Sequence, residues 1–370
     1  MEKVDVAIRG QGPVGLALAL ALGRQGLSVG VLGPAAEAAV ASADVRAYAL
    51  NASARALLSE IKVWDALPAD AVTAVDDMHI EGDQSGARLD FSAWQQGAEA
   101  LAWIVDAAEL EAALRAAVRF APHVRTLDGE CQAELRAFAE GKDSASRRAL
   151  GVAFERRFYG QTAVAARLVA SQPHGNVARQ WFRSPDILAL LPLDRPQPGR
   201  SFALVWSLPD ERAQAWLAAP AAEFEAALNE ACGDAVGTLT LASERAGWPL
   251  SIAHADPVCG PGWVLLGDSA HVVHPLAGQG LNLGLADVAA LARVIAAREP
   301  WRRLGDETLL RRYARERALP TRAMALVTDG LHHLFAADQP LLRELRNRGM
   351  TALNLLAPIK RALSARAIDA

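Results

Sequence analysis

The chain has 370 residues, with 38 Lys and Arg against 42 Asp and Glu and a net charge of −4 at pH 7. This length allows a large core and two domains, and the slightly acidic balance argues against nucleic acid as a partner. The three cysteines, Cys131, Cys232 and Cys259, lack the close pairs of metal and redox sites, so we expect reduced thiols in a cytoplasmic protein. We expect no secretory signal, and no apolar run approaches the ~20 residues that span a bilayer.

The first elements have the order of a dinucleotide-binding unit. Residues 4–8 predict a strand, an apolar helix follows to about residue 25, and residues 28–32 predict a second strand. The turn after the first strand contains Gly10, Gly12, Pro13, Val14 and Gly15. Glycines there permit a tight turn, the approach of the backbone to a pyrophosphate and close packing of the helix. The alternative is a tight turn that binds nothing.

One position departs from this pattern. Such units usually end the second strand with an acidic residue that binds the adenosine ribose, but this chain has Gly33 there. We therefore expect a weaker hold on the adenosine end of a bound dinucleotide.

The middle of the chain alternates predicted strands and helices. Residues 78–80, 87–91 and 103–105 predict strands, and Asp106 with Glu109 forms a plausible capping box for a helix to residue 118. Further strands are predicted at residues 124–126, 131–138, 162–170, 177–183, 202–208 and 237–242, with a helix at 221–231. Residues 244–250 are expected to return the chain to the first domain.

The most informative segment covers residues 263–287. The apolar run 263–266 predicts a buried strand of a parallel sheet, and Gly267 and Asp268 end it, so a carboxylate lies at the carboxyl edge of the sheet. Pro275 delays the next helix, and Gly278, Gln279 and Gly280 give a backbone that can lie flat against a ligand. From Leu281 apolar residues recur at helical spacing. The N-terminus of that helix would stabilise negative charge.

This segment resembles the Gly-Asp motif of class A FAD-dependent aromatic monooxygenases, and among them the ubiquinone-biosynthesis hydroxylases most closely. The resemblance implies that Asp268 hydrogen-bonds the ribityl chain of FAD and that residues 275–282, from Pro275 to Asn282, run beside the isoalloxazine ring. It also implies that Arg46, in an Asp-x-Arg-Ala segment beginning at Asp44, approaches the flavin and its pyrophosphate. A surface arginine ahead of a helix would look the same.

The fold implied by the resemblance is α/β, with a Rossmann-like FAD-binding domain, an interleaved β-sheet substrate domain like that of p-hydroxybenzoate hydroxylase, and C-terminal helices. We expect residues 1–75, 98–157 and 250–330 to form the discontinuous FAD-binding domain. Residues 76–97 and 158–249 then form the substrate domain, and residues 331–370 a C-terminal helical segment.

The activity implied by the resemblance is aromatic hydroxylation. NADPH or NADH reduces FAD as a transient reductant, O2 adds to the reduced flavin, and the hydroperoxyflavin hydroxylates a phenolic or prenylated ring in ubiquinone biosynthesis. Two alternatives stay open: a hydroxylase of a small soluble phenol, and a catalytically impaired member that serves as a binding or assembly subunit. The second rests on Gly33, on Ala107 and Glu140 where the family has a polar residue and Asp, and on the short region 119–138.

Two histidines near the motif, His271 and His274, are weak catalytic candidates. Their spacing lacks the i,i+4 pattern and third ligand of a zinc site, so we expect no metal. As bases they would have to reach a substrate hydroxyl through at most one water, and a structural hydrogen-bonding role is the more common one.

The C-terminal part from Leu341 is basic and rich in leucine. It is predicted either to touch the inner face of an anionic membrane, where a quinone precursor would dissolve, or to pack on the domain as a helix pair. A homo-oligomer or a multienzyme complex remains open.

Overall fold

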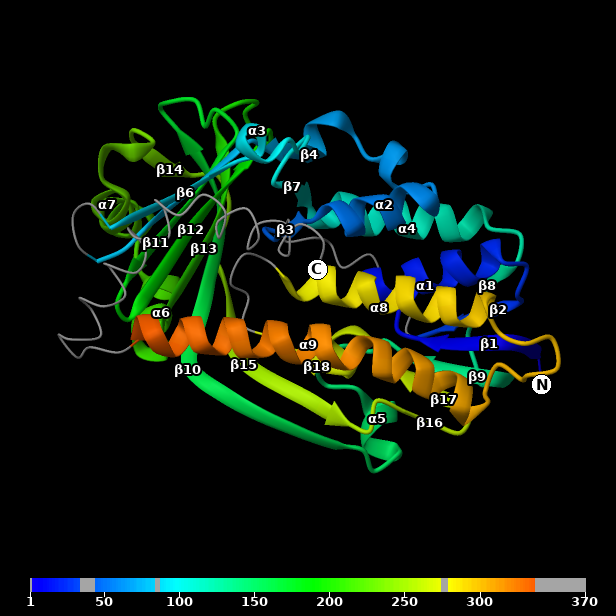
Figure 1. Cartoon of the computed structure of the whole chain (residues 1–370). Coiled ribbons are helices and arrows are strands. Elements are labelled where there is room, and N and C mark those ends of the chain that lie inside the picture. The colour runs from blue at the N-terminus through cyan, green and yellow to red at the C-terminus, as the bar shows by residue number, and fades with distance from the viewer. Residues whose placement is uncertain (1, 34–43, 84–86, 274–278, 337–370) are drawn as a thin grey trace.

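The computed structural model describes residues 2–33, 44–83, 87–273 and 279–336 (Figure 1). Within these residues the strands form three sheets. A six-stranded sheet has the order β16-β17-β9-β1-β2-β8, and a three-stranded sheet has the order β3-β7-β4. A nine-stranded sheet has the order β18-β15-β10-β13-β12-β11-β5-β6, with β14 paired to β10.

The six-stranded sheet is mainly parallel. β1 (Lys3–Arg9), β2 (Val29–Leu32), β8 (Val124–Leu127), β9 (Gln132–Phe138) and β17 (Trp263–Leu265) run in one direction, and β16 (Cys259–Gly260) is antiparallel to β17. The carboxyl ends of β1 and β17 therefore open at the same edge, which is where ligands bind in sheets of this type.

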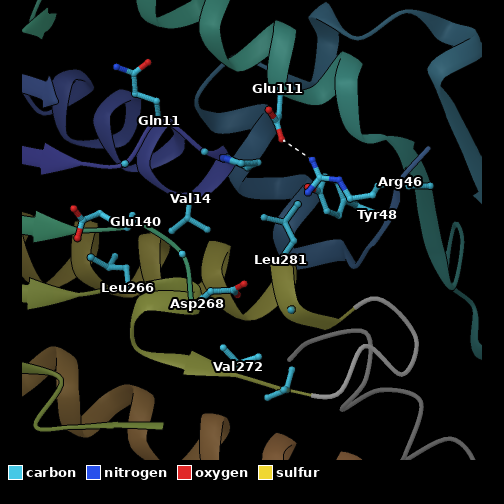
Figure 2. Close-up of a pocket in the computed structure, with 18 of the residues that line it drawn as sticks. Gln11, Val14, Arg46, Tyr48, Glu111, Glu140, Leu266, Asp268, Val272 and Leu281 are labelled. Atoms are coloured by element: carbon cyan, nitrogen blue, oxygen red, sulfur yellow. Dashed lines mark hydrogen bonds and ion pairs between the residues drawn. The ribbon is translucent and has the colours of Figure 1, made fainter. Parts of the chain in front are cut away.

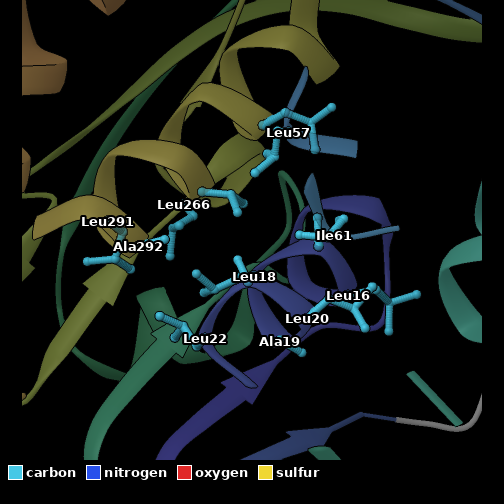
Figure 3. Packing of buried hydrophobic residues seen from close by; sticks show 14 of the residues in the cluster. Leu16, Leu18, Ala19, Leu20, Leu22, Leu57, Ile61, Leu266, Leu291 and Ala292 are labelled. Carbon is cyan, nitrogen blue, oxygen red and sulfur yellow. The ribbon is translucent and has the colours of Figure 1, made fainter. Parts of the chain in front are cut away.

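Helices α1 (Pro13–Arg24), α4 (Ala107–Phe120) and α8 (Gln279–Ala296) pack beside this sheet and build the main core. The leucines of α1 lie against Leu266, Leu291 and Ala292, as Figure 3 shows. Residues Leu16–Leu22 of α1 are buried all round, because the helix lies between α4 and α8. This packing fixes the turn before α1 relative to the turn after β17.

The nine-stranded sheet has one face against helices and one against the main body. Its strands are β5 (Asp77–Glu81), β6 (Arg88–Ser92), β10 (Ala153–Ala170), β11 (Val177–Arg183), β12 (Asp186–Leu193), β13 (Ser201–Pro209), β14 (Leu239–Leu241), β15 (Ala246–Asp256) and β18 (His271–Val272). Alternate residues of β13, Leu204, Trp206 and Leu208, pack with α6 (Asp210–Ala218) and α7 (Ala221–Cys232). Because side chains alternate along a strand, Val205 and Ser207 face the other way.

The remaining elements join these parts. β3 (Ala47–Leu50), β4 (Val72–Val75) and β7 (Ala102–Asp106) form the small antiparallel sheet. The described chain also contains the α-helices α2 (Ala52–Glu60), α3 (Ala93–Gln96), α5 (Ala145–Ala149) and α9 (Glu307–Ala336). Helix α9 extends along the front of the view in Figure 1. No helix among the described residues is long and apolar enough to cross a membrane.

Several elements differ from the prediction. β10 begins at Ala153 instead of residue 162, and β12 and α6 were not predicted at all. Residues 244–250, expected to return the chain to the first domain, instead contain the start of β15, which pairs with β10. The first half of β10 was not predicted because it contains charged residues. The start of β15 was not predicted because it contains Pro249, and proline is unusual inside a sheet.

The predicted capping box at α4 forms only in part. Asp106 accepts hydrogen bonds from the backbone of Ala108 and Glu109, as an N-cap residue should. Glu109 does not complete the box, because its carboxylate accepts a 2.5 Å hydrogen bond from Arg195 on the β12–β13 connection. The helix start is therefore tied to the nine-stranded sheet.

Candidate active site

The turn between β1 and α1 has a backbone that only glycine allows. Gly10 has φ 118°, and a Cβ there would lie 2.1 Å from the carbonyl oxygen of Ala139. A Cβ on Gly15 would lie 2.1 Å from the carbonyl oxygen of Gly10. At Gly12, in contrast, a Cβ would meet no protein atom within 4 Å. The space beside Gly12 is therefore open to a ligand.

Helix α1 begins at this turn without a side-chain cap. Gly12 is the N-cap residue, and Pro13 occupies the first helical position. The free N–H groups of the first turn and the positive end of the helix dipole favour a bound anion there. Together with the open space at Gly12, this is the geometry that the pyrophosphate of a dinucleotide needs.

A cavity of about 870 Å³ connects this turn to the nine-stranded sheet. Figure 2 shows Val14, Arg46, Tyr48, Asp268 and Leu281 around it. The wall from the sheet combines apolar and polar residues: Gln180, Ile187, Ala189, Leu191, Val205 and Ser207. The volume lies within the range typical of small-molecule and cofactor sites.

Asp268 enters the cavity from the turn after β17. Gly267 before it has φ 57°, and Val14 lies 3.2 Å from where a Cβ on Gly267 would be. The carboxylate of Asp268 is accessible from the cavity and forms no hydrogen bond with a described residue. Because protein atoms crowd its other sides, desolvation raises its pKa, although His271 and Lys142 oppose this. A ligand with hydroxyl groups would supply the missing partners.

Arg46 lies in the cavity wall, and neighbouring carboxylates fix its side chain. Its guanidinium binds both carboxylate oxygens of Asp44, at 2.6 Å and 2.9 Å, and approaches Glu111 at 3.4 Å. Burial would raise the pKa of Asp44, but its hydrogen bonds with Arg46 outweigh burial and lower it. The arginine is therefore charged and positioned beside the ring of Tyr48, 5.9 Å from the ring centre.

The residues at the start of α8 divide into two groups. Gly280 and Leu281 line the cavity. The side chain of Asn282 is buried instead: its Nδ2 donates to the carbonyl of Ala49 at 2.9 Å, and its Oδ1 accepts from the N–H of Asn51 at 3.1 Å. Asn282 thus ties α8 to the connection between β3 and α2. The predicted residues Pro275, Gly278 and His274 lie outside the described residues, and Gln279 is the first residue of α8.

A buried network behind the Gly267 turn was missed by the sequence reasoning. Asp287 of α8 is fully buried; it accepts from the N–H of Gly267 at 2.9 Å and from Nε of Arg317 at 2.7 Å. Nε2 of His271 lies 2.7 Å from the same carboxylate. Burial disfavours both charges, but the mutual attraction raises the pKa of His271 and lowers that of Asp287. His271 therefore belongs to the scaffold of the turn and does not line the cavity.

Glu140 and Arg147 fix the other side of this turn. Glu140 accepts hydrogen bonds from the hydroxyl of Ser144 at 2.5 Å and from the backbone and hydroxyl of Ser146. Arg147 donates to the carbonyls of Ser269 and Lys142, at 3.0 Å and 2.9 Å. The longer side chain at position 140 therefore still borders the cavity, but its oxygens bond to the loop itself.

The departures at Gly33 and Ala107 are also accounted for by local structure. Gly33 has φ 147°, a backbone conformation that L-residues rarely adopt, and its carbonyl accepts from Nε2 of Gln11. An acidic side chain at this position would strain the turn. Ala107 is completely buried at the start of α4, so it has no access to a ligand.

Comparison with known proteins shows the family to which the chain belongs. The model of the FAD binding domain matches residues 3–125 and 93–328. The ubiquinone hydroxylase UbiL of Rhodospirillum rubrum is 31% identical over 96% of this chain and 87% of its own length. The chain belongs to the FAD-dependent ubiquinone hydroxylase family. Another member, the 3-demethoxyubiquinol 3-hydroxylase of Escherichia coli, is 29% identical over 97% of each chain.

Solved structures agree with the fold. PqsL, a probable FAD-dependent monooxygenase from Pseudomonas aeruginosa, superimposes with a TM-score of 0.77 over 94% of this chain and 99% of its own, at 22% identity. HpxO of Klebsiella pneumoniae, solved with FAD and uric acid, gives a TM-score of 0.71 over 98% and 97%, at 18% identity. The predicted class A monooxygenase fold is confirmed.

The family assignment also confirms the predicted cofactor and enzyme class. The protein is an FAD-dependent monooxygenase of the type that NADPH or NADH reduces. The uncapped α1, the open space at Gly12 and the unpartnered carboxylate of Asp268 fit FAD. Among the described residues, no three His, Cys, Asp or Glu side chains come together as a metal site would require.

Proposed function

We propose that the protein hydroxylates a phenolic or prenylated aromatic ring in ubiquinone biosynthesis. The observation that carries this proposal is a single cavity that combines the Gly12 turn, Asp268 and the start of α8 with apolar residues of the nine-stranded sheet. The names of the two full-length relatives, both ubiquinone-pathway hydroxylases, support it. A small soluble phenol is the competing substrate.

We propose the following arrangement for FAD, which supplies O2 activation and oxygen-atom transfer once it is reduced. The turn of Gly10, Gly12, Pro13, Val14 and Gly15 holds the pyrophosphate at α1, and Asp268 holds the ribityl hydroxyls. Gly267, Gly280 and Leu281 provide a close-fitting backbone, and Arg46 supplies positive charge. Pro275, Gly278 and Gln279 remain proposed ring contacts, whereas Asn282 acts by holding α8 in place.

The substrate is proposed to bind against the nine-stranded sheet. Ile187, Ala189, Leu191 and Val205 offer an apolar face to an aromatic ring, and Gln180 and Ser207 offer polar atoms to its oxygen substituents. A largely apolar wall with a few polar groups favours binding and orientation of an aromatic ring.

Purified protein should bind FAD and oxidise NADPH or NADH faster when a suitable phenol is present. The measurement is a visible spectrum after addition of excess FAD, followed by nicotinamide oxidation with no phenol, a small soluble phenol or a prenylated phenol. Product analysis distinguishes hydroxylation from uncoupled oxidation. If the protein bound no FAD even at saturation, the alternative of a catalytically impaired binding or assembly subunit would replace this proposal.

We further propose peripheral contact with an anionic membrane through the basic, leucine-rich sequence from Leu341, which lies outside the described residues. The protein should sediment with liposomes that contain anionic lipid, and deletion of the residues after Leu341 should weaken this. Neutral liposomes are the control. Equal sedimentation of the truncated protein would contradict the proposal.

The domain division remains a proposal: residues 1–75, 98–157 and 250–330 for FAD, 76–97 and 158–249 for the substrate, and a C-terminal segment 331–370. Helix α9 runs through residue 330 without a break, so the last boundary falls inside a helix. The protein is also proposed to act as a homo-oligomer or within a multienzyme complex.

A further inference from the structure

A second cavity of about 830 Å³ borders the other elements around the Gly267 turn. It shares no lining residue with the first cavity, the one proposed for FAD. Both touch residues 268–273: Asp268, Val272 and Val273 line the first cavity, whereas Ala270 and His271 line the second. Helix α9 forms one side of it, and β15, β16 and their connection form the other. We call it the α9 groove.

Positive charge is concentrated in the α9 groove. Four arginines of α9 line it: Arg311, Arg315, Arg317 and Arg322. Arg311 pairs with Glu307, and Arg317 pairs with the buried Asp287. Neither Arg315 nor Arg322 forms an ion pair with a carboxylate of the described residues; Nε of Arg315 donates to the carbonyl of Arg311 at 3.2 Å. The groove therefore contains two guanidinium groups without an ion-pair partner among the described residues, beside the carboxylate of Asp256 on the facing strand.

The positive charge in the groove acts on a histidine of the facing strand. His254 of β15 lines the groove opposite α9. Burial lowers the pKa of His254, and the positive charges of His271 and Arg322 lower it further, against the weaker opposite effect of Asp256. The positive charges of β18 and α9 thus face one space, which an anion would occupy favourably.

One buried hydroxyl in the groove lacks a partner. Thr321 of α9 is 5% exposed, and its Oγ1 has no hydrogen-bond partner among the described residues. Buried hydroxyls are almost always bonded to protein, water or ligand. Thr321 lies four positions after Arg317, on the same side of α9, and both line the groove. Trp263 and Val258 add an apolar wall.

We propose that the α9 groove binds a phosphate group carried by a small molecule or a lipid, separately from FAD. Arg315 and Arg322 supply charge-assisted hydrogen bonds, for which guanidinium and phosphate are geometrically matched. The hydroxyl of Thr321 donates to the same group. The floor of the groove is the His271, Asp287 and Arg317 network, so a phosphate bound there lies next to the support of the Gly267 turn.

The test uses protein saturated with FAD, so that the turn at Gly12 is already occupied. Inorganic pyrophosphate and AMP are titrated by calorimetry, and vesicles of phosphatidylglycerol are compared with vesicles of phosphatidylcholine. We expect the double variant Arg315→Gln and Arg322→Gln to weaken binding at least tenfold, and Thr321→Val to weaken it several-fold. All of these side chains lie on one helix, and the two arginines are exposed, so the fold should be kept.

Arg303→Gln is the matched control, because Arg303 is 84% exposed and does not line the groove. Binding of pyrophosphate or AMP assigns a soluble ligand to the groove. Binding of anionic vesicles without binding of pyrophosphate or AMP assigns a lipid headgroup. Either result supports the site if the double variant loses that binding. The proposal is overturned if neither probe binds at millimolar concentration, or if Arg303→Gln weakens binding as much as the double variant. The FAD spectrum of every variant should remain that of the parent protein.

Discussion

Replacement of Asp268 by alanine is expected to abolish retention of FAD while the protein stays folded. The carboxylate faces the cavity and has no hydrogen-bond partner among the described residues, so its partners should come from the cofactor. A hydrogen bond to a charged group contributes about 1.5–3 kcal/mol, so the loss of two such bonds weakens FAD more than about 100-fold. The measurement is the dissociation constant of FAD by fluorescence or absorbance titration.

The stability of the apoprotein variants distinguishes a role of Asp268 in binding FAD from a role in maintaining the fold. Desolvation raises the pKa of Asp268 above its ordinary value of 3.8 in the folded protein without ligand. A carboxyl group with a raised pKa destabilises the folded state at neutral pH, where it must stay charged. The Asp268→Ala apoprotein should therefore be at least as stable as the parent apoprotein, and Asp268→Asn should bind FAD with intermediate affinity. Unchanged affinity in both variants would mean that FAD is placed wrongly in this cavity.

The turns at the carboxyl ends of β1 and β17 could be predicted from the sequence because the signals for them are local. The strand, glycine turn and helix around Gly10 and Gly12 follow from chain geometry, and Asp268 follows from the end of an apolar run. Each signal needs only a few neighbouring residues, and a parallel sheet then brings the two turns to one edge.

The supports of the site could not be predicted in the same way. Asp287 reads as a polar residue on a helix, and nothing near it in sequence reveals that it bonds to Gly267 and Arg317, 20 and 30 positions away. Asn282 was expected beside the flavin, but its amide bonds to residues more than 200 positions earlier. Such roles depend on which helices pack together, which periodicity does not specify.

The nine-stranded sheet, which lines the cavity, was also only partly predictable from the sequence. Strand β15 contains Gly247 and Pro249, and β10 contains charged residues over its first half, so neither has the apolar alternation of a predictable strand. Both form because they pair with each other over a long antiparallel register. Pairing between distant segments overrides weak local preference for the strand conformation.

Replacement of Asp287 by alanine is expected to cost about 3–5 kcal/mol of unfolding free energy. It would leave His271, Arg317 and the N–H of Gly267 without their shared acceptor in the core, and removal of one partner from a buried ion pair has an effect of this size. Urea unfolding of the apoprotein measures it. The matched control is Glu316→Gln, which breaks an exposed pair with Arg293 and should change stability by less than about 1 kcal/mol.

The dependence on pH identifies the ion pair as the cause. The pKa of His271 is raised above 6.5, so its contribution is fully present below pH 6.5 and is lost as pH rises through the raised value. The pKa of Asp287 is lowered below 3.8, so its contribution is present above pH 3.8 and is lost as pH falls through the lowered value. The stability gap between the parent and His271→Gln should therefore narrow as pH rises above 6.5. If the difference in stability between the parent and His271→Gln stayed constant from acid to alkaline pH, His271 would stabilise the turn by packing alone. The affinity of Asp287→Asn for FAD would then show whether the charge at position 287 matters to the site.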